Sequence, residues 1–201
     1  MAMEVDFQLE PFAQFRYFLD FAKTNSVREY DAMTLATVGA DGFPSARVLY
    51  MKELSEKGLI FYTNYESQKS KELEENSKVC VNFFWPEVFI QVRISGTIQK
   101  LNREQSVAYF QTRPRISQIG AWASHQSQEM PNYDHLLKRF SEYEKKFEGL
   151  TVPCPEEWGG YLLMPQEFEF WIGREGRLHE RYCYRKDHNL SNGWVRFMRS
   201  P

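Results

Sequence analysis

Residues 33–51 have the sequence MTLATVGADGFPSARVLYM. Both ends of this stretch, Met33–Val38 and Ser45–Met51, are strand-like, and the Asp41-Gly42 pair between them is a turn signal. The stretch therefore predicts a β-hairpin. Further strands joined by short turns along the chain then decide the class of fold.

Strand-like runs continue along the chain. They span residues 58–63, 79–85, 88–99, 160–171, 177–185 and 193–198, whereas helical patterns span about 11–25, 67–76, 103–121 and 133–147. Most strands are joined by short turns, and a doubly wound parallel sheet would need a helix after nearly every strand. We therefore expect a mainly β fold with peripheral helices, built on an antiparallel sheet or barrel. Because no linker divides the chain, residues 1–201 are expected to form one domain.

Composition narrows the class of protein. The 201 residues include 25 Lys and Arg against 27 Asp and Glu, a formal net charge of −2, which argues against a broad nucleic-acid surface. No apolar run approaches the roughly 18 residues of a membrane span, and the N-terminus lacks the features of a secretory signal. Cys80, Cys154, Cys183 and the histidines show no metal-ligand spacing. We expect a cytoplasmic protein with no metal, nucleic-acid or membrane partner.

The segment Ser67-Gln68-Lys69-Ser70 begins a predicted helix with unpaired N–H groups, two hydroxyls and a cation. Such a helix start can bind an anion, because the N–H groups and the helix dipole both favour negative charge. A serine that only caps a surface helix explains the same residues without any ligand and is the more common case.

Residues 109–118 form a second candidate. Tyr109 and Arg113 would share a helix face if the helix persists to Pro114, and Ser117 follows just after the turn. Together they would suit a phosphate or a carboxylate. An arginine that ends a helix and interacts with its dipole is an equally good local explanation.

The third candidate is Arg177-Leu178-His179-Glu180-Arg181. If this segment is a strand, Arg177, His179 and Arg181 share one face and form an electropositive wall of an anion-binding pocket. From periodicity alone, a strand that faces solvent is as good an interpretation.

Taken in order, these pieces resemble the pyridoxine 5′-phosphate oxidase family, also called the pyridoxamine-phosphate oxidase family. The matching segments cover nearly the whole chain from Glu10 onward: residues 45–52, 61–64, 109–120, 124–127, 158–160, 169–171 and 177–181. The resemblance implies a split β-barrel that binds FMN at the interface of a homodimer. It also implies oxidation of a phosphorylated B6 vitamer to pyridoxal 5′-phosphate, with O2 as acceptor and H2O2 as product.

The resemblance assigns roles residue by residue. Near the FMN phosphate it places Arg47, Gln68, Lys69, Gln126 and Ser127. Along the rest of the flavin it places Val48, Leu49, Tyr50, Met51, Lys52, Tyr62, Thr63, Gln91, Trp171 and Arg181. Lys52, Tyr109, Arg113 and Ser117 would bind the substrate phosphate, and the catalytic pair Arg177 and His179 would lie over the substrate ring. Arg177 would stabilise developing charge, whereas His179 would orient the substrate or assist proton transfer.

The chain also departs from the family pattern. Gln68 and Ile90 stand where arginines are usual, and Ile172 replaces a usual glutamine. No counterpart of the family's basic N-terminal lid precedes Glu10, which predicts incomplete closure over the substrate or a truncated chain. Two alternatives stay open: an oxidase of the same fold with another substrate, as in phenazine biosynthesis, and a non-catalytic protein that binds FMN or pyridoxal phosphate.

Overall fold

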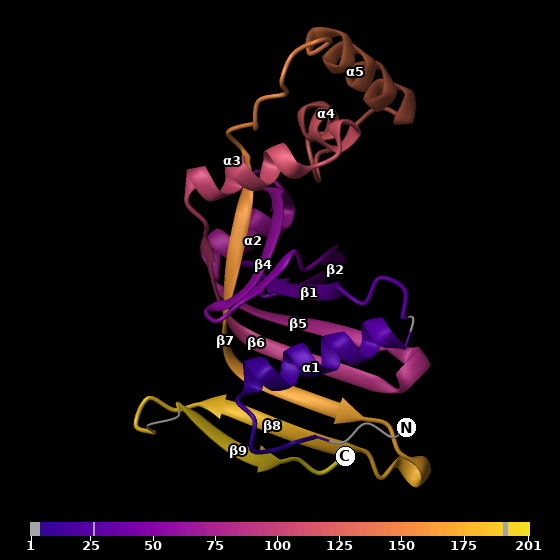
Figure 1. The fold of residues 1–201 in the computed structure, drawn as a ribbon. Helices are drawn as coiled ribbons and strands as arrows, with labels where there is room; N and C mark the ends of the chain where they lie inside the picture. Colours follow the sequence, from indigo (N-terminus) through magenta and orange to yellow (C-terminus); the bar gives the residue numbers. More distant parts are fainter. Residues whose placement is uncertain (1–4, 26, 191–192) are drawn as a thin grey trace.

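The computed structural model describes residues 5–25, 27–190 and 193–201, and the remaining parts of the predicted domain 1–201 lie outside the described residues. Its centre is one antiparallel, strongly curled sheet (Figure 1). The strands are β1 (Ala32–Val38), β2 (Pro44–Tyr50), β3 (Glu53–Ser55), β4 (Gly58–Asn64), β5 (Lys78–Trp85), β6 (Ile90–Lys100), β7 (Trp158–Ile172), β8 (Glu180–Lys186) and β9 (Trp194–Met198). The path β2-β1-β5-β6-β7-β4-β3 is extended where β8 pairs with β7 and β9 with β8. The predicted mainly β class is confirmed.

Helices surround this sheet. They are α1 (Pro11–Thr24), α2 (Gln68–Glu75), α3 (Arg103–Thr112), α4 (Arg115–Ala123) and α5 (Tyr133–Lys146), with short 3-10 turns η1 (Pro86–Val88) and η2 (Glu175–Arg177). Figure 1 shows α1 lying across the sheet and α3, α4 and α5 grouped beyond one end of it. The helical segment predicted over 103–121 is two helices, because Pro114 lacks an N–H and the residue before it, Arg113, is extended.

The hairpin of residues 33–51 forms as the sequence predicts, with Leu35 opposite Arg47. One face of the sheet is the core: Leu35, Val81, Ile94, Phe168 and Tyr184 lie opposite one another on successive strands and are fully buried. Helix α1 covers this face with an amphipathic stripe of phenylalanines, including Phe15, whose ring lies 5.1 Å from that of Phe83. Helix α1 does not cover the other face of the sheet, to which Gln91 and Trp171 belong.

Gly96 lies where β6 and β7 shift register, and a Cβ there would come 2.2 Å from the main-chain oxygen of Met164. We expect Gly96→Ala to lower the free energy of unfolding by about 1–3 kcal/mol, because the backbone of β7 must move. Chemical denaturation measures this change. The control is Gly120→Ala in α4, where nothing lies within 4 Å of the new Cβ and stability should be unchanged or higher. Equal stability of the two variants would contradict the steric argument.

Candidate functional site

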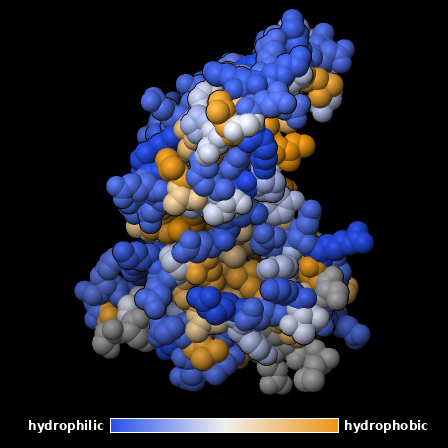
Figure 2. Space-filling view, turned by 45° about the horizontal axis from the view of Figure 1, so that its top comes forward, coloured by the Kyte–Doolittle hydropathy of each residue, from blue (hydrophilic) through white to orange (hydrophobic). Residues whose placement is uncertain are grey.

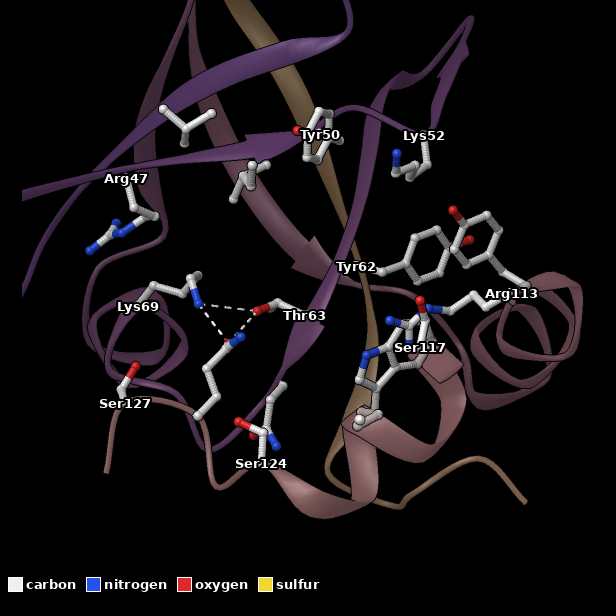
Figure 3. Close-up of a pocket in the computed structure, with 18 of the residues that line it drawn as sticks. Arg47, Tyr50, Lys52, Tyr62, Thr63, Lys69, Arg113, Ser117, Ser124 and Ser127 are labelled. Atoms are coloured by element: carbon white, nitrogen blue, oxygen red, sulfur yellow. Dashed lines mark hydrogen bonds between the residues drawn. The ribbon is translucent and has the colours of Figure 1, made fainter. Parts of the chain in front are cut away.

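A cavity of about 730 Å³ opens between β2, β4, α2 and the α3–α4 segment (Figure 3). It brings together most of the predicted site residues: Arg47, Val48, Leu49, Tyr50, Lys52, Tyr62, Thr63, Gln68, Lys69, Tyr109, Arg113, Ser117, Gln126 and Ser127. Figure 3 shows cations at two ends, with Arg47 and Lys69 at one and Lys52 and Arg113 at the other. The cavity can therefore hold a ligand, or two ligands, with anionic groups well apart.

Lys69 is the centre of the first end. Its Nζ donates to Thr63 Oγ1 at 3.1 Å, Ser67 Oγ at 3.2 Å and Gln126 Oε1 at 2.8 Å. Burial and the nearby Arg47 lower the pKa of Lys69 to about 8. Ser67 occupies the N-cap position of α2, but its hydroxyl donates to the Asn64 carbonyl rather than capping the helix. This leaves the first N–H groups of α2 without a side-chain cap.

Arg47 is held by a buried carboxylate that the sequence analysis missed. Arg47 Nη2 lies 3.2 Å from Glu72 Oε2, and Glu72 is 5% exposed. Burial opposes ionisation of Glu72, but hydrogen bonds from Thr37, Gln68 and Ser45 and the charge of Arg47 keep its pKa below the usual value. Gln68, the departure from the family arginine, donates to Glu72 Oε1 at 3.2 Å. In the sequence, only the i, i+4 spacing of residues 68 and 72 on a predicted helix indicates that the two side chains meet.

The second end is aromatic and cationic. The rings of Tyr62 and Tyr109 are stacked at 3.9 Å, and Trp158 stacks on Tyr62 at 5.3 Å. The guanidinium of Arg113 lies 4.7 Å from the Trp158 ring, and its buried Nη1 has no hydrogen-bond partner in the described part of the chain. A buried donor without a partner is costly, so a ligand that accepts from Arg113 would be stabilised here.

Lys52 lies in the cavity with its own ion pair, whereas Met51 lies in the core. Lys52 Nζ lies 3.6 Å from Asp31 Oδ2 and 4.6 Å from the centre of the Tyr50 ring. The Met51 side chain lies in the core and does not line the cavity.

Besides Met51, five predicted residues lie outside the cavity. These are Gln91, Trp171, Arg177, His179 and Arg181. Gln91 lies opposite Trp171, and Trp171 opposite Arg181, so these three share the sheet face that α1 does not cover. The Arg181 guanidinium binds the buried Glu169 and the Ser200 carbonyl.

The expected strand over 177–185 is wrong at its start. Arg177 belongs to the turn η2, and β8 begins at Glu180, so Arg177, His179 and Arg181 do not share a strand face. The reason is a left-handed backbone at Gly176 and Arg177, with φ of 64° and 62°, which a strand does not allow. The loop nevertheless keeps Arg177 exposed, and it places the His179 ring 4.6 Å from that of Trp171.

Strand β7 separates the two groups of residues. Trp158, at its start, lines the cavity, whereas Trp171, near its end, lies beside His179. A strand rises about 3.3 Å per residue, so these ends are roughly 40 Å apart along the chain path. Figure 1 shows β7 running from beside α3 at one end of the sheet to β8 at the other, so the two groups do not lie together within one chain.

The cavity also contains residues to which the sequence analysis gave no role. They are Asn64, Gly120, Ala121, Ser124 and Trp158. All but Ala121 lie within segments that resemble the family, and that resemblance could have indicated a role for them. The departures Ile90 and Ile172 are cross-strand partners, both buried in the core.

The curled antiparallel sheet with helices at its margins places the protein in the class of split β-barrels. Residues 22–147 match the family model described as pyridoxamine 5′-phosphate oxidase. Residues 158–201 match the pyridoxine 5′-phosphate oxidase C-terminal dimerisation region. The chain belongs to the pyridoxamine 5′-phosphate oxidase family, and the expectation that it is an enzyme of this type is confirmed.

Curated relatives agree with this membership over nearly the full length. The pyridoxine/pyridoxamine 5′-phosphate oxidase of Bdellovibrio bacteriovorus is 47% identical over 196 residues, covering 98% of this chain and 99% of that protein. The enzyme of the same name from Cupriavidus pinatubonensis is 48% identical over 182 residues, covering 90% and 85% of the two chains.

Solved structures confirm the split-barrel fold. PhzG from Burkholderia lata, in complex with tetrahydrophenazine-1-carboxylic acid, has a TM-score of 0.93 and 30% identity, covering 100% of this chain and 98% of that one. A pyridoxamine 5′-phosphate oxidase-related, FMN-binding protein from Nostoc punctiforme has a TM-score of 0.76 at 16% identity, covering 97% and 100%, which supports the fold alone. Among the described residues, no helix is both long and apolar enough to cross a membrane.

Proposed function

We propose that the protein is an FMN-dependent oxidase that converts pyridoxine 5′-phosphate or pyridoxamine 5′-phosphate to pyridoxal 5′-phosphate. O2 is the electron acceptor and H2O2 the product. The observation that carries this proposal is the pair of cationic ends in one cavity, since cofactor and substrate each bear a phosphate.

The donor set fits FMN. Arg47, Lys69, Gln126 and Ser127 would hold its phosphate, and Val48–Tyr50, Tyr62 and Thr63 would line the flavin. When bound, FMN supplies the two-electron redox chemistry and passes the electrons to O2. The substrate's C4′ alcohol loses two hydrogens to become the aldehyde, and the amine additionally takes up water and releases ammonia.

The residues of the chain bind and orient the substrate. Lys52, Arg113 and Ser117, beside the Tyr62–Tyr109 stack, would bind its phosphate. Arg177 and His179 would complete the site over the substrate ring, with Arg177 stabilising developing negative charge. Because they lie beyond the far end of β7, they must come from a second chain.

The homodimer that follows would pack through the sheet face opposite α1. That face carries exposed apolar side chains: Phe84, which lies opposite Gln91 in the row Gln91–Trp171–Arg181, is 56% exposed, and Val48 on β2 is 66% exposed. Figure 2 shows hydrophobic patches that interrupt a largely hydrophilic surface. We take residues 1–201 as one FMN-binding unit per subunit, working in the cytoplasm, where its three unpaired cysteines would stay reduced.

An absorption spectrum of the purified protein, followed by anaerobic addition of pyridoxine 5′-phosphate, tests the function. Bleaching of an oxidised-flavin band and steady H2O2 formation in air are expected. A colourless protein that does not take up FMN would overturn the proposal, and full FMN loading without turnover would favour a binding protein.

A second candidate is an oxidase for a phenazine precursor, favoured by the fold match to PhzG. Arg113 beside Tyr109 and Ser117 would suit either a phosphate or a carboxylate, but the 47% identity to the Bdellovibrio bacteriovorus enzyme against 30% to PhzG favours the phosphorylated substrate. Parallel assays with pyridoxine 5′-phosphate and a dihydrophenazine carboxylic acid distinguish the two.

The pKa of Lys69, lowered to about 8 by burial and by Arg47, predicts pH-dependent FMN binding. The phosphate binds the ammonium form, so the affinity for FMN should fall as pH rises through 8. Quenching of FMN fluorescence by apoprotein, titrated between about pH 7 and 9.5, measures it. Lys69→Arg, which stays charged, should flatten this dependence. An equally steep fall in the arginine variant would assign the titration to another group.

A further inference from the structure

The loop between β7 and β8 fixes the protonation pattern of His179. The main-chain N–H of Arg174 donates to His179 Nδ1 at 3.1 Å. An imidazole nitrogen that accepts a hydrogen bond carries no proton, so neutral His179 has its proton on Nε2. The nitrogen left for a ligand is then a donor.

A second set of contacts holds Arg174 in place. Arg174 Nε donates to Glu180 Oε1 at 2.5 Å, and the Tyr182 hydroxyl donates to Glu180 Oε2 at 2.6 Å. These hydrogen bonds, with the charge of Arg174, keep the pKa of Glu180 below its usual value, so the carboxylate stays ionised. Because Glu180 and Tyr182 belong to β8, the loop is anchored to the sheet.

The base of the loop is tightly packed. Gly173 N–H donates to the Phe89 carbonyl at 2.8 Å, and a Cβ on Gly173 would come 3.1 Å from Phe89 Cβ. The ring of Trp171 lies 4.6 Å from the His179 ring at an interplanar angle of 41°. With Arg174 on its Nδ1 edge and Trp171 on one face, the imidazole has little freedom to turn.

We propose that Glu180 is a positioning residue that, through Arg174, holds His179 as a hydrogen-bond donor from Nε2. This proposal rests on the proposed function, in which His179 contacts the substrate. His179 then recognises an acceptor atom of the bound ring and orients it. It does not act as a general base, because its only basic nitrogen is occupied by the Arg174 N–H.

Nitrogen-15 NMR of the FMN-loaded protein with labelled histidine tests the tautomer directly. The His179 signals are assigned by their loss in His179→Gln. At a pH where the imidazole is neutral, wild type should show a protonated Nε2 and an unprotonated Nδ1. In Glu180→Ala the two tautomers should mix, and kcat for pyridoxine 5′-phosphate should fall about tenfold with little change in KM, because the phosphate is held elsewhere.

The matched control is Glu74→Ala, which removes the exposed 2.7 Å ion pair with Lys100 and should leave the His179 signals and kcat unchanged. Glu180→Gln, which keeps the shape, should give a smaller effect and replaces the alanine variant if that fails to fold. A protonated Nδ1 in wild type, or unchanged His179 signals and kcat in the Glu180 variants, would overturn the proposal. Absence of turnover in wild type would overturn the proposed function alone, since the spectrum still decides the tautomer.

Discussion

Replacing Arg113 with methionine is expected to raise the KM for pyridoxine 5′-phosphate about a hundredfold. Hydrogen bonds to charged groups contribute about 1.5–3 kcal/mol each, and 1.4 kcal/mol corresponds to a factor of ten. The buried Nη1 of Arg113 lacks a partner among the described residues, and the phosphate would supply it. Steady-state H2O2 formation measures KM, and bound FMN should stay at the wild-type level because Arg113 lies at the opposite end of the cavity from Lys69.

Two comparisons separate phosphate binding from packing. Methionine keeps an apolar stem against Trp158, over which Arg113 stacks at 4.7 Å. Any slow turnover of unphosphorylated pyridoxine should be unaffected by the substitution, and Arg113→Lys should recover part of the loss. If both substrates lost the same factor, Arg113 would be a packing residue and the assignment of this end to a phosphate would be wrong.

Two inactive variants should restore activity when they share a dimer. Lys69→Ala damages the cavity end of the chain, and Arg177→Ala damages the loop beyond β7. If each site combines the cavity of one subunit with the loop of its partner, a mixed dimer has one intact site and one doubly damaged site. Random pairing then gives about a quarter of wild-type activity from two nearly inactive chains.

Co-expression with two different affinity tags and purification of the mixed dimer measures this recovery. With one intact site of two, the purified mixed dimer should reach about half of wild-type activity. The control pairs Lys69→Ala with Arg47→Ala, both in the cavity, which cannot produce an intact site in any combination. Recovery in the control, or none in the test pair, would place the whole site within one subunit. Full activity of the purified Arg177→Ala homodimer would show that Arg177 has no catalytic role.

Much of this arrangement can be predicted from the sequence, and the limits have physical causes. The hairpin 33–51 is predictable because its turn signal and apolar runs are local, whereas the three-residue β3 is too short to leave a pattern. The alternation Arg177, His179, Arg181 imitates a strand, but the left-handed backbone of Gly176 and Arg177 places η2 there instead.

The sequence does not predict that the site residues fall into two distant groups, because this depends on which strands pair and in which register. Family resemblance names Lys69 and Trp171 together as flavin residues, yet no local pattern indicates that one lies in α2 beside the cavity and the other near the far end of β7. Glu72 was missed for a related reason: apart from Gln68 on its own helix, its partners Thr37, Ser45 and Arg47 come from β1 and β2, and only tertiary structure brings them to the carboxylate.

The position of β7 in the sheet also sets the order of assembly during synthesis. Among the described strands, β4 pairs only with β3 and β7, so the hairpin that carries Tyr62 and Thr63 joins the rest of the sheet through β7 alone. Tyr62 lies opposite Gly160, far along the chain, and such non-local pairing slows folding. One wall of the cavity is therefore expected to close only after the ribosome has released residues 158–172, when most of the polypeptide has already been made.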